Sequence, residues 1–398
     1  MTFQWFLSKT VRQATAMRNH VEKILNHQRD ILSPQAVQAV DGAALDLQKA
    51  VEAKADPATL EKQMEKLENV ANKWLKPYPN AAWRENVEVL LVALAVAMGI
   101  RTFFLQPFKI PTGSMQPTLF GVTSRNLINE PDFKIPTGWT RVREWFAGAS
   151  YLQVRAENDG ELSVGQPLRF LIFNIKQTVA IGGHPYTLWF PPDYGSQTLE
   201  QRAEIHPGQV FHRGEEVLKL QVNAGDHLFV DRVTYNFCPP ERGEIIVFET
   251  KGIPEERREP FRIPADQFYI KRLVGLGGER IQIGSDRHLI INGRRLDSST
   301  PHFEKVYSFN PNDPPAESHY PGESHYSGHV DGPFLAPFFQ NQPEGVLIPK
   351  DHYMVMGDNT LNSLDSRAWG YFPATSVIGK SFFVYWPITD RFGWGYHR

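Results

Sequence analysis

The most informative stretch of this chain is Ile110-Pro111-Thr112-Gly113-Ser114-Met115-Gln116-Pro117-Thr118-Leu119, which follows the apolar run Val89 to Ile100. Proline fixes φ and glycine frees the backbone, so this composition predicts a rigid, bent loop rather than a helix or central strand. Such a loop can hold the Ser114 hydroxyl in one direction. A serine in a turn usually has only a structural role, and it becomes a nucleophile when a base takes its proton.

A lysine that burial keeps neutral can act as that base. Lys271 is the candidate, because it lies in a mostly apolar run from Phe268 to Leu276. With a period of two, Tyr269, Lys271 and Leu273 share one face of a predicted strand. The alternative is a lysine at a strand edge whose ammonium group reaches water.

Four blocks in order resemble the sequence boxes of bacterial type I signal peptidases, also called leader peptidases. The serine stretch after an apolar run resembles their serine box. Blocks Gly225 to Val230 and Arg242 to Phe248 resemble the strand pair before the lysine, and Tyr269 to Gly275 resembles the lysine box. The segment Gly357 to Gly370 resembles the last box. With the strands between them, these blocks cover about half of the chain.

The resemblance implies a Ser-Lys dyad, with Ser114 as nucleophile and Lys271 as general base. In the family the oxyanion is held by the serine's own N–H and by a hydroxyl two residues earlier, here that of Thr112. Serine is the best-known occupant of that position, and the methyl group of threonine restricts its rotamers. Candidates for the substrate pocket are Ile110, Met115 and Tyr269.

The last box supplies supporting residues by the same resemblance. Ser363 matches a serine that hydrogen-bonds the lysine and orients it. Asp365 and Arg367 match a pair that supports the site without touching the scissile bond; the alternative is an ordinary surface ion pair. The chain departs from the family pattern at Thr360-Leu361, which replace an Arg-Asp pair, and at Gly277, which replaces a proline.

Length and composition limit the number of domains and the kinds of partner and cofactor. A length of 398 residues predicts two or more units. The net charge of -2 gives no support for nucleic-acid binding. The single cysteine, Cys238, excludes an intramolecular disulfide. Histidines 302, 319, 325 and 329 match no zinc spacing, so they are interpreted as solvated loop residues, and we expect neither a metal nor an organic cofactor.

Residues 84–105 are predicted to form one transmembrane helix. The apolar core is short, with Glu88 and Arg101 near its ends, so a buried helix of a soluble protein competes with this interpretation. Both charges lie where side chains can reach the interface. The resemblance favours a span with residues 1–80 in the cytoplasm and the catalytic domain on the outer side of a bacterial inner membrane.

The predicted fold is α+β: a mainly β catalytic domain of antiparallel signal-peptidase type, behind an N-terminal helical region and the transmembrane helix. Residues 1–80 are expected to form two or three helices that start at Ser33-Pro34 and Asp56-Pro57. The catalytic serine segment is 106–120, followed by a β-rich insertion at 121–221. The β core with the lysine spans 222–300, a surface excursion 301–345, and the rest of the core 346–398.

Period-two patterns predict the individual strands of the insertion and core. The predicted ranges are 168–175, 179–190, 228–233, 245–249, 267–274, 280–283, 289–291, 346–356 and 376–385.

The resemblance implies a membrane-bound serine endopeptidase that removes signal peptides from exported preproteins after small residues, at A-x-A-like sites. Its partners would be such preproteins and the lipid bilayer, with no nucleic acid. The N-terminal helices are either a self-association or partner module or a solvated spacer. Two alternatives are a soluble Ser-Lys self-cleaving regulator and a catalytically silent membrane-anchored scaffold protein.

Overall fold

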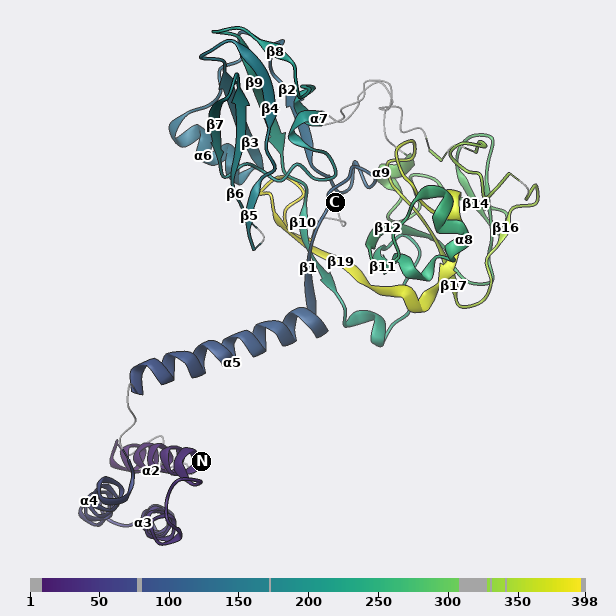
Figure 1. Cartoon of the computed structure of the whole chain (residues 1–398). Helices are drawn as coiled ribbons and strands as arrows, with labels where there is room; N and C mark the ends of the chain where they lie inside the picture. The colour runs from purple at the N-terminus through teal and green to yellow at the C-terminus, as the bar shows by residue number, and fades with distance from the viewer. Residues whose placement is uncertain are drawn as a thin grey trace. The chain divides into compact units, whose positions relative to one another are not determined.

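A computed structural model describes residues 9–76, 81–171, 173–307, 328–329, 331–340 and 342–394 of the chain. The chain divides into two compact units, Met1–Leu94 and Ala95–Arg398, so the boundary falls inside one long helix. The first unit is helical, and the second consists mainly of antiparallel strands (Figure 1). The predicted α+β class is confirmed.

Three helices form the body of the first unit: α2 (Lys9–Gln28), α3 (Pro34–Glu52) and α4 (Pro57–Trp74). Two of them start at the predicted capping residues. The side chain of Ser33 accepts a hydrogen bond from the N–H of Ala36, and that of Asp56 from the N–H of Thr59. The helices bury a small common core, whose members include Val21, Leu25, Val40, Leu47 and Leu67.

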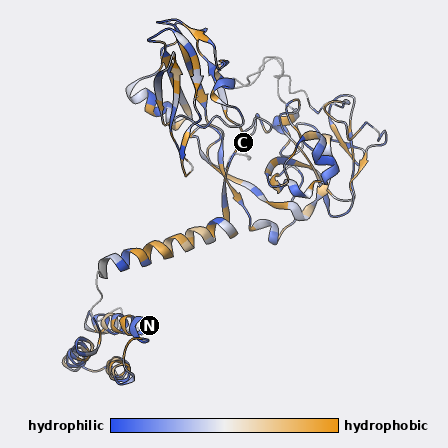
Figure 2. Ribbon diagram, viewed as in Figure 1, coloured by the Kyte–Doolittle hydropathy of each residue, from blue (hydrophilic) through white to orange (hydrophobic). Residues whose placement is uncertain are grey.

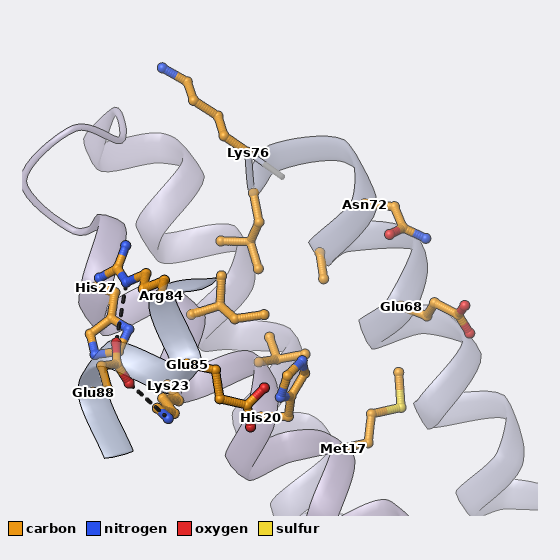
Figure 3. A pocket seen from close by; sticks show the side chains of 14 residues that line it. Met17, His20, Lys23, His27, Glu68, Asn72, Lys76, Arg84, Glu85 and Glu88 are labelled. Carbon is orange, nitrogen blue, oxygen red and sulfur yellow. Dashed lines mark hydrogen bonds and ion pairs between the residues drawn. The ribbon is translucent and has the colours of Figure 1, made fainter. Parts of the chain in front are cut away.

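A cavity of about 810 Å³ lies in the first unit, between α2, α4 and the beginning of helix α5 (Ala81–Phe103) (Figure 3). Part of its charged lining is paired, since Glu88 binds Lys23 at 3.4 Å and Arg84 at 3.2 Å. The lining residues all precede Leu94, so this cavity contains neither member of the predicted dyad.

The predicted membrane helix is α5 (Ala81–Phe103). Its residues Trp83–Phe103 are long and apolar enough to cross a bilayer, and none of that window is buried inside the protein. Figure 2 shows apolar residues along most of its length. The described residues do not cover this helix, so the competing interpretation as a buried helix of a soluble protein has no support from burial. The helix also ends earlier than predicted, because Leu105 is already the first residue of strand β1.

The predicted catalytic domain is built on a seven-stranded antiparallel sheet in the order β1-β10-β19-β11-β12-β17-β18. The strands are β1 (Leu105–Lys109), β10 (His227–Asp231), β19 (Val377–Trp386), β11 (Ile245–Glu249), β12 (Phe268–Gly275), β17 (His352–Met356) and β18 (Phe372–Pro373). A smaller sheet follows the order β15 (Arg294–Arg295), β14 (Leu289–Ile291), β13 (Arg280–Ile283) and β16 (Val346–Leu347).

Short helical turns connect these strands. They are η1 (Thr234–Asn236), η2 (Thr250–Gly252), α8 (Glu255–Arg258), η3 (Glu259–Phe261), α9 (Glu304–Tyr307), α10 (Ser366–Trp369) and η4 (Ala374–Ser376). Apolar side chains alternate along the central strands and bury both faces of the sheet, so two separate clusters of core residues pack against it. This packing makes the sheet a rigid support for loops at its edges.

The segment between the serine loop and β10 forms a β subdomain with its own core. It contains β2 (Thr123–Asn126), α6 (Gly138–Phe146), β3 (Ala149–Arg155), β4 (Gly160–Val164), β5 (Leu168–Phe170), β6 (Phe173–Ile181), β7 (His184–Trp189), α7 (Leu199–Ala203), β8 (Val210–Phe211) and β9 (Glu216–Asn223). One sheet has the order β2-β9-β3, and the other has β5-β6-β4-β8 with β7 beside β6.

The interpretation of residues 301–345 as a surface excursion is wrong at its described ends. Phe303, Val306, Ala336 and Phe339 pack into the core beneath the smaller sheet. His329 is also buried, at 1% exposure, and its ring nitrogen lies 3.2 Å from the Tyr307 hydroxyl. It is therefore a core histidine rather than a solvated one, and its burial lowers its pKa to about 3. His319 and His325 lie outside the described residues.

Candidate active site

The structure brings Ser114 and Lys271 together, although 157 residues separate them. The Lys271 Nζ donates a hydrogen bond to the Ser114 Oγ at 2.7 Å. Lys271 projects from the middle of β12, and Ser114 lies in the loop that follows β1. Both are buried, at 5% and 9% exposure. The geometry is that of a nucleophile in contact with a base.

The surroundings of Lys271 favour its neutral form. Burial lowers its pKa to about 8, even though Asp365 and Asp358 attract the ammonium form. The Nζ also lies 3.1 Å from the Ile270 carbonyl and 5.5 Å from the centre of the Tyr269 ring. With this pKa roughly a tenth of Lys271 is neutral at pH 7 and about half at pH 8, which supplies the neutral form that a general base requires.

The serine loop is closed at its base by Asp226. The Ile110 N–H donates to the Asp226 carbonyl at 2.9 Å, and the Phe120 N–H donates to the Asp226 carboxylate at 2.8 Å. Arg391 pairs with that carboxylate at 3.0 Å. One buried residue thus joins both ends of the loop, so the nine residues between them have little freedom.

Residues of the last box hold the serine turn itself. The Asn359 N–H donates to the Ser114 carbonyl at 3.1 Å, and the Asn359 side chain donates to the Gly113 carbonyl at 3.0 Å. Asp358 accepts a hydrogen bond from Thr118 at 2.5 Å and forms a two-pronged ion pair with Arg272, the residue after the lysine. Asp358 therefore ties the serine loop to the lysine strand, and Asn359 holds the serine turn a second time.

These residues were not assigned roles from the sequence, although the four blocks contain them all. The sequence did contain a signal for these contacts, namely charged residues within apolar segments. An arginine or aspartate inside an apolar strand or box is rarely buried unless it is paired. Arg272 directly after Lys271 needed a buried acid, and Asp358 was the charged residue in the last box without an assigned role.

Asp365 and Arg367 form a fully buried pair, with both side chains at 0% exposure. Arg367 binds both carboxylate oxygens, at 2.9 and 2.8 Å, and donates to the Thr360 carbonyl at 2.6 Å. Burial raises the pKa of Asp365, but the Arg367 charge together with the hydrogen bonds to the carboxylate outweighs burial, and the net shift is downward. The alternative of an ordinary surface ion pair is wrong.

Ser363 lies beside the serine loop but does not make the predicted bond to Lys271. In the described part of the chain, its buried Oγ has no partner with hydrogen-bond geometry. It still lies close enough to Asp365 to lower the pKa of that carboxylate. Gly357 separates it from Ser114, since a Cβ there would lie 2.2 Å from the Ser363 Oγ and 2.4 Å from the Ser114 carbonyl oxygen.

This close approach makes Gly357 a sensitive position. We expect Gly357→Ala to lower kcat at least about 10²-fold, because the new methyl group displaces Ser114. Overpacking should also lower the free energy of unfolding by about 1–3 kcal/mol. Gly332→Ala is the matched control, since a Cβ there meets nothing within 4 Å. Unchanged kcat in a folded Gly357→Ala protein would contradict the geometry described for this contact.

The other predicted site residues lie around this pair. Thr112 is exposed, two residues before Ser114. Ile110 and Met115 are buried, at 2% and 0% exposure, in the core cluster below the serine loop. Tyr269 is half-buried and contacts the rings of Phe248 and Trp369. The contact of these three residues with a substrate stays a prediction.

Comparison with known proteins places this geometry in a family. The family described as "Signal peptidase, peptidase S26" matches residues 83–130 and 198–386, more than half of the chain. The chain belongs to this family. Residues 131–197, which hold α6 and β3 to β7, lie outside the match. They are an addition to the part that the family shares.

Individual relatives agree with this assignment. Signal peptidase I of Leptolyngbya laminosa is 34% identical over 174 residues, which cover 44% of this chain and 65% of that protein. Probable signal peptidase I-2 of Synechocystis is 27% identical over 169 residues, covering 42% and 58%. The match thus spans less than two thirds of either relative. A solved signal peptidase I from Enterococcus faecalis shares 27% identity, covers 36% of this chain and 97% of its own, and has a TM-score of 0.24.

Proposed function

We propose that this protein is a membrane-anchored serine endopeptidase that removes signal peptides from exported preproteins. The observation that carries the proposal is the 2.7 Å hydrogen bond from Lys271 Nζ to Ser114 Oγ in a buried, braced site. Membership of the signal peptidase family and the names of its relatives support the substrate class.

In the proposed reaction, the Ser114 Oγ attacks the scissile carbonyl carbon while neutral Lys271 accepts the hydroxyl proton. The tetrahedral intermediate collapses, the peptide C–N bond breaks, and the Lys271 ammonium protonates the departing amine. Lysine is then neutral again and takes a proton from the water that attacks the acyl-enzyme carbonyl. The ester C–O bond breaks, the acid product leaves, and the Lys271 ammonium returns the proton to the Ser114 Oγ. We assign the Ser114 N–H and the Thr112 hydroxyl as donors to the oxyanion.

The substrate would bind as an extended chain along an open strand edge. Strand β12 pairs with β11 along Phe268 to Arg272, whereas its pairing with β17 starts only at Arg272. In the described part of the chain no strand pairs with the other edge of Phe268 to Lys271. A peptide there would gain backbone hydrogen bonds beside Ser114, and shallow pockets would select small residues at an A-x-A-like site.

The apolar helix α5 supports the membrane location. Its exposed apolar side chains would be costly in water, and they suit the hydrocarbon core. Lys73, Lys76 and Arg84 near its beginning favour a cytoplasmic N-terminal side. Since β1 starts two residues after α5 ends, the site is tethered next to the outer membrane surface. We place the protein as a single-pass protein of the bacterial cytoplasmic membrane.

The proposal is tested by incubating the detergent-solubilised chain with a preprotein and determining the new N-terminus by mass spectrometry. We expect one cut after a small residue, and no cut by a folded Ser114→Ala variant. Cleavage that survives Ser114→Ala would remove Ser114 from its role. Failure of the wild type on several preproteins would favour the silent scaffold alternative.

A further inference from the structure

The β5–β6 hairpin of the added segment ends in an exposed apolar surface. We call it the apolar tip and define it as Leu168, Phe170, Leu171, Phe173, Trp189 and Phe190. These side chains are 55 to 82% exposed. Folded proteins seldom leave such a cluster in water unless it contacts a partner or a membrane.

The strand register gathers these residues at one end of the sheet. Phe170 lies opposite Phe173, while Leu168 and Trp189 both lie opposite Lys176 from its two sides. The Trp189 and Phe190 rings lie 6.5 Å apart, and the Phe190 N–H donates to the Ile175 carbonyl. The apolar tip is therefore one continuous feature of three adjacent strands.

The turn of this hairpin lacks the residues that hairpin turns usually contain. Hairpin turns favour glycine, asparagine and aspartate, because these residues tolerate positive φ. Here the sequence between the strands is Leu171-Ile172, and Leu171 has a φ of 53°. A bulky apolar residue in that conformation costs stability and is also exposed. Such a local conflict indicates a functional feature rather than a folding requirement.

The hairpin carries positive charge, which favours an anionic partner. Between residues 165 and 190 the sequence contains Arg169 and Lys176 but no aspartate or glutamate. Both cations are exposed beside the apolar tip. Basic residues next to exposed aromatic and aliphatic side chains complement a bilayer with anionic headgroups, and tryptophan favours the membrane interface.

The tip end of the hairpin is fixed to the strand that continues from α5. Arg169 donates to the Asn174 side chain at 3.0 Å, and Asn174 donates to the carbonyls of Pro191 and Pro192. The next residue, Asp193, pairs with Lys109 at the end of β1 at 2.5 Å. Strand β1 is only about 13 Å long from Leu105 to Lys109. The tip end of the hairpin is thus joined to β1 about 13 Å from the start of that strand, which follows the proposed membrane helix.

We propose that the apolar tip is a second membrane contact, which inserts into the headgroup boundary of an anionic bilayer and holds the catalytic domain at the surface. This inference rests on the proposed membrane anchoring by α5. The added segment would then restrict the tilt of the domain relative to its single helix, so that the active site faces substrates that arrive in the membrane.

The full chain allows a direct test, because Cys238 is its single cysteine. In a Cys238→Ser background, an environment-sensitive fluorophore is attached to Leu171→Cys at the tip. The matched control is His184→Cys, exposed at the opposite end of β6, about 25 Å away. A fluorophore on Val96→Cys in α5 reports whether this helix lies in the bilayer. Each protein is reconstituted into vesicles of phosphatidylcholine and phosphatidylglycerol that carry brominated acyl chains.

We expect bromolipid quenching at position 171 to be at least about twofold stronger than at position 184, and to weaken when phosphatidylglycerol is omitted. Equal quenching at 171 and 184, with strong quenching at 96, would overturn the second contact and leave anchoring intact. Absence of quenching at 96 would overturn anchoring and this inference together. A tip that only an added preprotein shields, and not lipid, would be a substrate surface instead.

Discussion

Lys271→Met is expected to lower kcat/KM by at least about 10⁴-fold while the protein stays folded. Methionine has nearly the same length, so it fills the space of the lysine stem, but it cannot accept the Ser114 proton. A buried ammonium group disfavours folding because burial removes its hydration. The free energy of unfolding should therefore stay unchanged or rise near neutral pH, where the lysine side chain in the unfolded chain is charged.

The matched control for this variant is Lys219→Met. Lys219 is also buried, at 8% exposure, and its Nζ binds the Glu130 carbonyl at 2.9 Å in the β subdomain. Its replacement should leave kcat/KM unchanged. Preprotein cleavage in detergent measures the rate, and tryptophan fluorescence during chemical denaturation measures stability. A folded Lys271→Met protein that keeps a tenth of the activity would assign the base to another group.

Arg367→Met is expected to reduce the free energy of unfolding by about 3–5 kcal/mol, because it leaves the Asp365 carboxylate charged and buried. It also removes the donor to the Thr360 carbonyl. The double variant Asp365→Asn with Arg367→Met should cost less than Arg367→Met alone, since no isolated charge remains. The same denaturation experiment measures both.

The comparison for this effect is Arg125→Met, which breaks an exposed ion pair with Glu130. Exposed pairs contribute about 0–1 kcal/mol, so this control should change stability little. If Arg367→Met and Arg125→Met cost the same, the buried pair does not stabilise the last box as the structure indicates.

Local sequence signals predicted most of the β core. The strands predicted at 245–249, 280–283 and 289–291 have those bounds in the structure, because glycine, proline or asparagine marks their ends. The strand predicted at 346–356 is instead two strands, β16 and β17, because the Pro349 ring cannot donate to a ladder and Asp351 adopts a φ of 60°. Here the turn signal was present and was not used.

The hairpin of the apolar tip could not be predicted from such local signals. Strands were predicted at 168–175 and 179–190, but the chain turns at Leu171 and β6 runs without a break from Phe173 to Ile181. Its turn contains no glycine, proline, asparagine or aspartate, so periodicity alone could not reveal it. The next turn, at Gly182-Gly183 between β6 and β7, does carry this signal, because both glycines have positive φ.

The active site could not be predicted from local signals for a different reason. Spacing along the chain gives no information about a contact between residues 114 and 271, so the dyad was predicted through the family resemblance. The network that braces it, through Arg272, Asp358 and Asn359, depends on pairs that are distant in sequence. The predicted bond from Ser363 to Lys271 failed because Lys271 is directed to Ser114, with Gly357 lying between Ser363 and the serine turn.

The pH dependence of kcat/KM on a preprotein tests the central claim most directly, since neutral Lys271 is the form that accepts the Ser114 proton. The structure places its pKa at about 8. For the detergent-solubilised wild type, kcat/KM should rise about tenfold per pH unit from pH 6 and level off above about pH 8. A rate that is flat across this range, or that falls as pH rises, would contradict a Ser-Lys mechanism.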